Sequence, residues 1–116
     1  MIKIYGIPNC DIVKKAIDWF KQKKIVYQFH NFKTDEISRA KLLEWINIAG
    51  LDVVVNKRST TWRTLSQEKQ QEMQNTKQAI EILMVETSII KRPVIENEKG
   101  LVIGFDELEY KIKFGS

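Results

Sequence analysis

The spacing of apolar residues divides the first third of the chain into three elements. Ile2–Tyr5 is a short apolar run that predicts a strand. From Asp11 to Lys23, apolar residues recur at the helical spacing on one face and charged residues occupy the other, which predicts a helix. Ile25–Phe32 is rich in β-branched and aromatic residues and predicts a second strand. A strand–helix–strand start requires a parallel strand pair joined by a right-handed crossover.

The middle of the chain, about residues 38–86, has the pattern of a block of helices. Ser38 is a suitable N-cap for a helix that stops at Gly50. Two further helices are expected to begin at Ser66 and at Asn75 or Thr76. The residues expected on the inner face of the first helix of this block are Leu42, Leu43, Ile46 and Ala49.

The chain is expected to close with a hairpin and a helix. Val94–Glu96 and Leu101–Ile103 flank the turn Asn-Glu-Lys-Gly, and a short helix follows from about Asp106. The complete order predicts an α/β, thioredoxin-like fold, with a four-stranded mixed sheet and a helical insertion at about residues 38–86. We expect a single domain over residues 1–116.

Composition narrows the classes of function. No run of about 18 apolar residues occurs, so no membrane-spanning helix is expected. The N-terminus is too short and too mixed for a signal peptide, and a single cysteine, which cannot form an internal disulfide, favours a cytoplasmic location. With His30 as the only histidine, no metal site based on cysteine and histidine is expected. The net charge of +4 is modest and spread along the chain, so nucleic-acid binding is not favoured.

The single cysteine lies in the segment IYGIPNC, between the first predicted strand and the first predicted helix. There Cys10 stands at or next to a helix N-terminus, where backbone N–H groups and the helix dipole favour a thiolate. Cysteines in such positions have pKa values lowered to about 3.5–7.5, which makes them nucleophilic at neutral pH. Lys14 and Lys15 lie about one turn further on, whereas Asp11 opposes the effect. The alternative is a buried structural cysteine, a common environment for a lone thiol.

The chain has no Cys-x-x-Cys motif, because residue 13 is valine. Cys10 therefore cannot resolve its own mixed disulfide within such a motif. Any redox cycle requires a second thiol from a small molecule or another protein.

Two basic segments are candidates for binding an anionic group. KRPV, residues 91–94, places Arg92 and Pro93 where the strand after the helical block begins, beside the first helix N-terminus in the thioredoxin plan. The planar fork of an arginine suits a carboxylate or a tetrahedral oxyanion, and the alternative is a solvated surface arginine. NKRSTTW, residues 56–62, combines two cations with three hydroxyl groups. This segment is either an anion-binding loop or a polar connector that caps a helix.

Together these elements resemble the ArsC family, whose best-known members are glutaredoxin-linked arsenate reductases and the Spx regulators. The YffB-like branch shows the same pattern of Tyr-Gly, Asn-Cys-Asp and Lys-Lys at the first strand–helix junction. The resemblance runs from Met1 to about Lys113. It continues through FHNF (29–32), NKRSTTWRTL (56–65), the Ile-Leu-Met helix (82–84), IIKRPVI (89–95) and VIGF (102–105).

The resemblance implies a thioredoxin-like fold and an oxidoreductase activity. It assigns the nucleophile to Cys10 and implies a substrate or glutathione site formed by Asn9, Arg58, Arg92 and Pro93, with a cis bond before Pro93. By the same analogy the protein is a glutathione-dependent monothiol reductase, with glutathione as co-substrate and no metal. The partners implied are glutathione, glutaredoxin and a small-molecule or protein thiol substrate, and we expect a monomer.

Two positions depart from the arsenate reductases that the chain resembles. Those enzymes have a third arginine where this chain has Phe105, and a histidine before the cysteine where it has Gly6. The loss of a cation and an imidazole weakens the binding of a multiply charged oxyanion, so arsenate is the less favoured substrate. The missing second cysteine likewise separates the chain from Spx proteins that sense oxidation through a disulfide.

A non-enzymatic Spx-like regulator that binds RNA polymerase is the alternative function, and a family member without activity is a third interpretation. His30 lies between aromatic residues on the second predicted strand. We expect it to be a structural residue that is hydrogen-bonded at the sheet edge, and not a general base. The tryptophans are expected to pack and not to bind a ligand; they are Trp19, Trp45 and Trp62.

Overall fold

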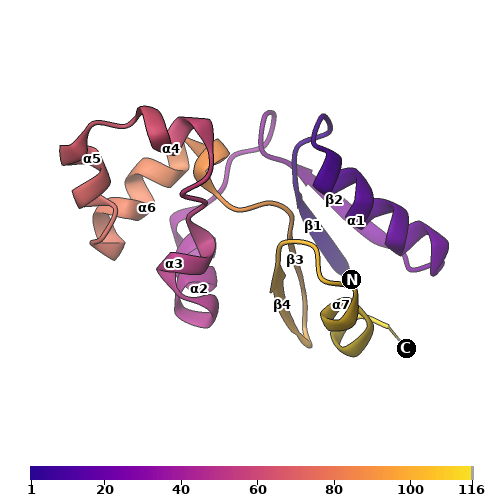
Figure 1. Cartoon of the computed structure of the whole chain (residues 1–116). Coiled ribbons are helices and arrows are strands. Elements are labelled where there is room, and N and C mark those ends of the chain that lie inside the picture. The colour runs from indigo at the N-terminus through magenta and orange to yellow at the C-terminus, as the bar shows by residue number, and fades with distance from the viewer. Residues whose placement is uncertain (116) are drawn as a thin grey trace. The chain divides into compact units, whose positions relative to one another are not determined.

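The computed structural model describes residues 1–115, and its elements follow the predicted order (Figure 1). The chain divides into two compact units. The first consists of Met1–Asp35 and the segment from Arg92 onward, and the second is Glu36–Lys91. The predicted helical insertion at residues 38–86 falls within the second unit.

The first unit contains the predicted four-stranded mixed sheet. The strand order is β2-β1-β3-β4, in which β1 and β2 are parallel and the other two pairs are antiparallel. Its elements are β1 (Ile2–Gly6), α1 (Asp11–Gln22), β2 (Tyr27–Asn31), β3 (Val94–Asn97), β4 (Gly100–Ile103) and α7 (Glu107–Lys113).

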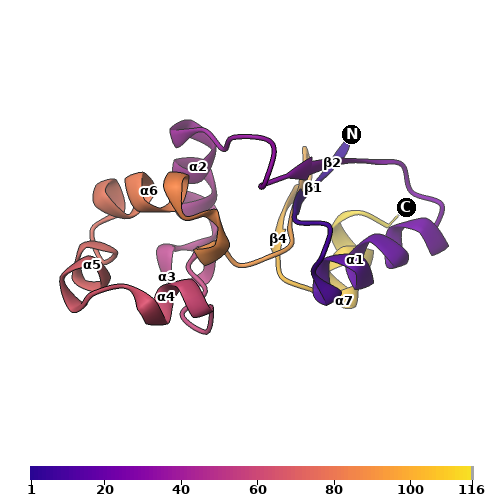
Figure 2. The ribbon, with the colours of Figure 1, turned by 90° about the horizontal axis from the view of Figure 1, so that it is seen from above.

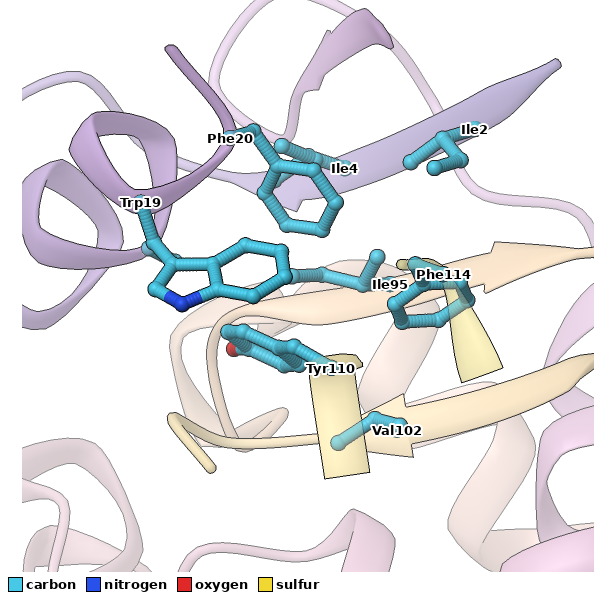
Figure 3. Close-up of a cluster of buried hydrophobic side chains, with 9 residues drawn as sticks. Ile2, Ile4, Trp19, Phe20, Ile95, Val102, Tyr110 and Phe114 are labelled. Carbon is cyan, nitrogen blue, oxygen red and sulfur yellow. The ribbon is translucent and has the colours of Figure 1, made fainter. Parts of the chain in front are cut away.

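The helices α1 and α7 share one hydrophobic core with the sheet. The register aligns Ile4 with Ile95 and Ile95 with Val102, so these buried side chains face the same way from three strands. Aromatic side chains of the two helices and of the residue after α7 complete the cluster (Figure 3); they are Trp19, Phe20, Tyr110 and Phe114. Such rings each bury a large area. The helices α1 and α7, which overlap in the view of Figure 2, are in contact through Phe20 and Tyr110, whose ring centroids lie 5.5 Å apart. This packing fixes α1, and with it the start of the helix.

The second unit is helical, as predicted. It consists of α2 (Arg39–Ala49), α3 (Leu51–Val54), α4 (Thr60–Thr64), α5 (Gln67–Glu72), α6 (Thr76–Val85) and the 3-10 turn η1 (Thr87–Ile89). The expected caps are confirmed, because the side chains of Ser38, Ser66 and Asn75 each accept a bond from a backbone N–H three residues on. Buried apolar residues of the unit include Leu42, Trp45, Ile46, Ala79, Ile80 and Leu83.

One residue prediction for this unit was wrong, and short helices were not predicted. Leu43 is 43% exposed, because the inward stripe of α2 runs through Leu42, Trp45 and Ile46 at the i, i+3, i+4 spacing, which leaves Leu43 outside it. Gly50 ends α2 as expected, but the sequence did not predict the short helices α3 and α4. In the structure Gly50 has φ of 95° and α3 starts directly after it. In the part of the chain described, none of the helices has the length and apolarity needed to cross a membrane.

Candidate active site

The turn between β1 and α1 places Cys10 at the start of the helix. Cys10 is the N-cap, with φ −137° and ψ 121°, and its carbonyl accepts a bond from the backbone N–H of Lys14 at 3.0 Å. Its side chain caps none of the first-turn N–H groups and is partly exposed. The predicted junction position is therefore confirmed, and the alternative of a fully buried thiol is wrong. First-turn N–H groups lack intrahelical acceptors, so they are available to a thiolate or another anion.

The sheet register brings Arg92 and Pro93 to the edge where this turn begins. In the antiparallel pair β1–β3, Tyr5 lies opposite Val94. The residue after Tyr5 and the residue before Val94 therefore share one edge of the sheet. The structure thus gathers the Cys10 turn, with the exposed Asn9, and the Arg92–Pro93 segment at this edge. The Arg92–Pro93 peptide bond is cis, as expected.

The guanidinium group of Arg92 has an unsatisfied donor. Its Nε atom is buried and has no hydrogen-bond partner among residues 1–115. A buried N–H without an acceptor costs about 1–3 kcal/mol, so such an atom in a native protein calls for an explanation. Arg92 is therefore not the fully solvated surface arginine considered as the alternative.

Arg58 belongs to the second unit and stands just before α4. Its backbone N–H donates to Asn56 Oδ1 at 3.0 Å, and Ser59 Oγ accepts from the backbone N–H of Trp62 at 3.1 Å. These bonds identify residues 56–62 as a helix-capping connector, one of the two interpretations of this segment. The side chain of Arg58 is exposed, and its role as an anion ligand stays a prediction.

The sequence pattern of the ArsC family matches residues 5–112. The chain belongs to the ArsC family. An uncharacterized protein of Haemophilus influenzae is 40% identical over 114 residues, which cover 98% of this chain and 99% of that protein. The global transcriptional regulator Spx of Streptococcus mutans is 26% identical over 113 residues, or 96% of this chain and 81% of that protein.

Solved structures of family members have the same fold. A YffB protein superposes with a TM-score of 0.92 at 34% identity, covering 97% of this chain and 98% of that one. An arsenate reductase-related protein from Brucella melitensis gives a TM-score of 0.73 at 30% identity, covering 97% and 93%. The thioredoxin-like α/β fold is confirmed, and the relatives include both transcriptional regulators and proteins related to arsenate reductase.

In this ArsC-family protein, Gly6 allows α1 to approach the end of β1. A Cβ atom added at Gly6 would lie 2.8 Å from Val13 Cγ2 and 3.1 Å from Val13 Cγ1. Val13 is fully buried in the first turn of α1, so it has little room to move. Gly6 therefore leaves no room for the histidine that the resemblance places there in arsenate reductases. Val13, where a Cys-x-x-Cys motif has its second cysteine, is a packing residue.

Phe105 makes a contact with α1 that the sequence analysis missed. Lys15 Nζ lies 5.0 Å from the centroid of the Phe105 ring, which is a cation–π geometry. The Phe105 ring also meets Tyr110 edge-on, with centroids 5.6 Å apart. The Tyr110 hydroxyl donates to the carbonyl of Gly104, and burial raises the pKa of Tyr110 above its usual value of 10.0. No local signal predicts the pair, because Lys15 and Phe105 lie near opposite ends of the chain.

His30 packs among aromatic rings on β2. Its ring centroid lies 4.8 Å from that of Tyr5 and 5.7 Å from that of Phe32. Its Nε2 atom is buried without a hydrogen-bond partner among the residues described, so the expected hydrogen bond is wrong for this nitrogen. The neighbours that the structure places against the imidazole include the aromatic rings of Tyr5 and Phe32. The expected position at the sheet edge is confirmed, because β2 is an edge strand.

The part of the chain that the structure describes has no candidate metal centre, and it has a cavity that does not include Cys10. Within residues 1–115 no group of three or more His, Cys, Asp or Glu side chains is arranged to hold a metal ion. The second unit contains a cavity of about 910 Å³ that is rich in glutamine side chains and includes Lys57 and Trp62 in its lining. Neither Cys10 nor Arg58 lines this cavity.

Proposed function

We propose that this ArsC-family protein is a glutathione-dependent monothiol reductase with Cys10 as its nucleophile. The observation that carries the proposal is the position of Cys10 as the N-cap of α1, partly exposed and without a capping bond from its side chain. The helix N-terminus supplies N–H donors and the positive end of the helix dipole, both of which favour a thiolate. The absence of a second cysteine in the chain means that an external thiol must complete the cycle.

The proposed reaction is thiol–disulfide exchange in two steps. The Cys10 thiolate attacks one sulfur of a substrate disulfide, the substrate S–S bond breaks, and the other half leaves as a thiolate that takes a proton from water. The thiolate of glutathione then attacks the substrate sulfur of the mixed disulfide, which releases Cys10 as a thiolate. In sum, one half of the substrate is reduced to a thiol and glutathione is oxidised to a mixed disulfide. Glutaredoxin is the macromolecular alternative as donor of the second thiol.

Arg92 is proposed to bind a carboxylate of glutathione or of the substrate. A carboxylate oxygen would satisfy its buried Nε donor, and the planar guanidinium fork matches carboxylate geometry. Asn9 and Pro93 are proposed to line the same site, and Arg58 to add a second cation. Gly6 and Phe105 stand where the resemblance expects an imidazole and a third arginine, so the proposed substrate is a disulfide and not arsenate.

Turnover with 2-hydroxyethyl disulfide and glutathione tests this proposal, with glutathione oxidation followed by a coupled assay. We expect turnover above the uncatalysed rate for the wild type and none for Cys10→Ser. Arg92→Lys keeps the charge but loses the fork, and it should raise the KM for glutathione about tenfold, as expected when a charge-assisted hydrogen bond is lost. A wild-type rate equal to that of Cys10→Ser overturns the proposal.

A second candidate function is transcriptional regulation through RNA polymerase. The observation that favours it is the identity of 26% to Spx over 96% of this chain. A regulator of this kind should co-purify stoichiometrically with RNA polymerase from cell extract, and the complex should survive Cys10→Ser. If polymerase is absent and turnover depends on Cys10, the reductase is favoured and the regulator is excluded.

A further inference from the structure

We propose that Lys15, held over the ring of Phe105, is a specificity-determining residue that binds a carboxylate of the substrate. The inference rests on the proposed function and names its substrate class, mixed disulfides in which one half is an acidic peptide such as glutathione, so that the other half leaves as a reduced thiol. The central observation is the 5.0 Å distance between Lys15 Nζ and the Phe105 ring centroid.

This pair is placed at the end of the sheet that carries Cys10. Phe105 directly follows Gly104, whose N–H donates to the carbonyl of Pro93 at 2.8 Å. Lys15 lies five residues beyond the N-cap of α1, about 7.5 Å along the helix axis at 1.5 Å per residue. Lys15 therefore lies in the half of α1 nearer to Cys10.

The Phe105 ring is held by buried neighbours. It meets the buried Tyr110 edge-on at 5.6 Å, and Tyr110 in turn contacts Trp19 of α1 at 5.5 Å. The hydroxyl of Tyr110 donates to the carbonyl of Gly104, which fixes the residue just before Phe105. A fixed ring restricts the otherwise flexible lysine, so less rotamer entropy remains to be lost when a ligand binds.

A carboxylate fits the Lys15 ammonium better than a neutral group does. An aromatic face attracts a cation but does not neutralise it, and the ammonium keeps its N–H donors for a carboxylate. Arg92, with its buried Nε, offers a second cation at the same edge of the sheet. Glutathione has two carboxylates and can engage both cations, whereas 2-hydroxyethyl disulfide can engage neither.

Binding of S-methylglutathione to the Cys10→Ser protein, followed by calorimetry, tests the carboxylate contact without any chemistry. At low salt we expect Lys15→Gln to raise the Kd about fivefold, the upper range for a partly exposed ion pair, and added salt to reduce this effect. Phe105→Leu keeps apolar bulk but removes the aromatic face, and it should raise the Kd about twofold.

The matched control is Lys21→Gln, which makes the same charge change in the last turn of α1, away from Cys10. It should leave the Kd within about 1.5-fold of the parent value, because long-range charge effects are weak in water. Equal effects of Lys15→Gln and Lys21→Gln overturn the proposal, since net charge alone then explains the change.

The rate of mixed-disulfide formation at Cys10 provides a second test of the proposal. Lys15→Gln should slow the reaction with glutathione disulfide about fivefold and change the reaction with 2-hydroxyethyl disulfide less than twofold. Equal slowing of both reactions overturns the proposal, because Lys15 then acts through the thiol and not on the substrate. If S-methylglutathione binds in a Lys15-dependent way but Cys10 forms no adduct with glutathione disulfide, only the proposed function is overturned. If there is neither binding nor an adduct, the proposed function and this proposal are both overturned.

Discussion

At the scale of single residues, Gly6 determines how closely α1 approaches β1. We expect Gly6→Ala to lower the free energy of unfolding by about 1–3 kcal/mol, because the new methyl group would lie 2.8 Å from Val13 Cγ2. Urea unfolding of the variant measures this loss. If the clash is the cause, Val13→Ala should cost less in the Gly6→Ala background than in the wild type. Strictly additive losses contradict this explanation.

Tyr110 is a second residue whose role can be measured, because its hydroxyl bonds to the carbonyl of Gly104. Tyr110→Phe leaves a buried acceptor unpaired and should lower the free energy of unfolding by about 1–3 kcal/mol at neutral pH. Burial raises the pKa of Tyr110 above 10.0, so the native state holds the phenol proton more tightly than the unfolded chain does. The stability from this proton is complete below the unfolded pKa and is lost as the pH rises above it.

Urea unfolding at a series of alkaline pH values checks the sign of this linkage. Between about pH 9 and pH 11 the wild type should lose more stability than Tyr110→Phe, which has no phenol to titrate. Parallel losses in the two proteins would show that Tyr110 keeps an ordinary pKa in the native state.

At the scale of elements, the N-terminus of α1 lacks the side-chain cap that α2 has. Cys10 forms no capping bond, whereas Ser38 at the start of α2 accepts from the N–H of Lys41 at 3.1 Å. We therefore expect Cys10→Ser to be more stable than Cys10→Ala by about 0.5–2 kcal/mol, as measured by urea unfolding. Equal stability of the two variants would contradict the inference that the first-turn N–H groups lack a cap.

The elements themselves were largely predictable, because their signals are local. Helical spacing identified α1, and the cap residues Ser66 and Asn75 identified the starts of α5 and α6. The short helices α3 and α4 have too few residues to show a period, which is why they were missed. The position of Cys10 followed from a strand and a helix that are adjacent in sequence.

Contacts between distant parts of the chain were predictable only where topology dictates them. The position of Arg92 and Pro93 beside the Cys10 turn follows from the pairing of β3 with β1, which is part of the thioredoxin-like fold. The Lys15–Phe105 contact depends on side-chain directions in α1 and after β4, and no pattern in either segment reveals it. The unsatisfied Nε of Arg92 likewise appears only when the packing is known.

At the scale of the whole molecule, the chain divides into two compact units, and the residues proposed to act on the substrate can be tested unit by unit. Cys10, Arg92 and Phe105 belong to the first unit, and Arg58 belongs to the second. If Arg58 binds the substrate as proposed, Arg58→Ala should raise the KM for glutathione several-fold and leave the folded state intact, because its side chain is exposed. If the KM is unchanged, Arg58 does not bind the substrate, and the proposed reaction then depends on residues of the first unit.

The central claim is that Cys10 forms a mixed disulfide with glutathione. Mass spectrometry of the intact protein after incubation with oxidised glutathione tests it most directly, with Cys10→Ser as the matched control. We predict a single glutathione adduct on the wild type, located at Cys10 and removed by added reduced glutathione, and no adduct on Cys10→Ser. A wild-type protein that stays unmodified under these conditions would contradict the account.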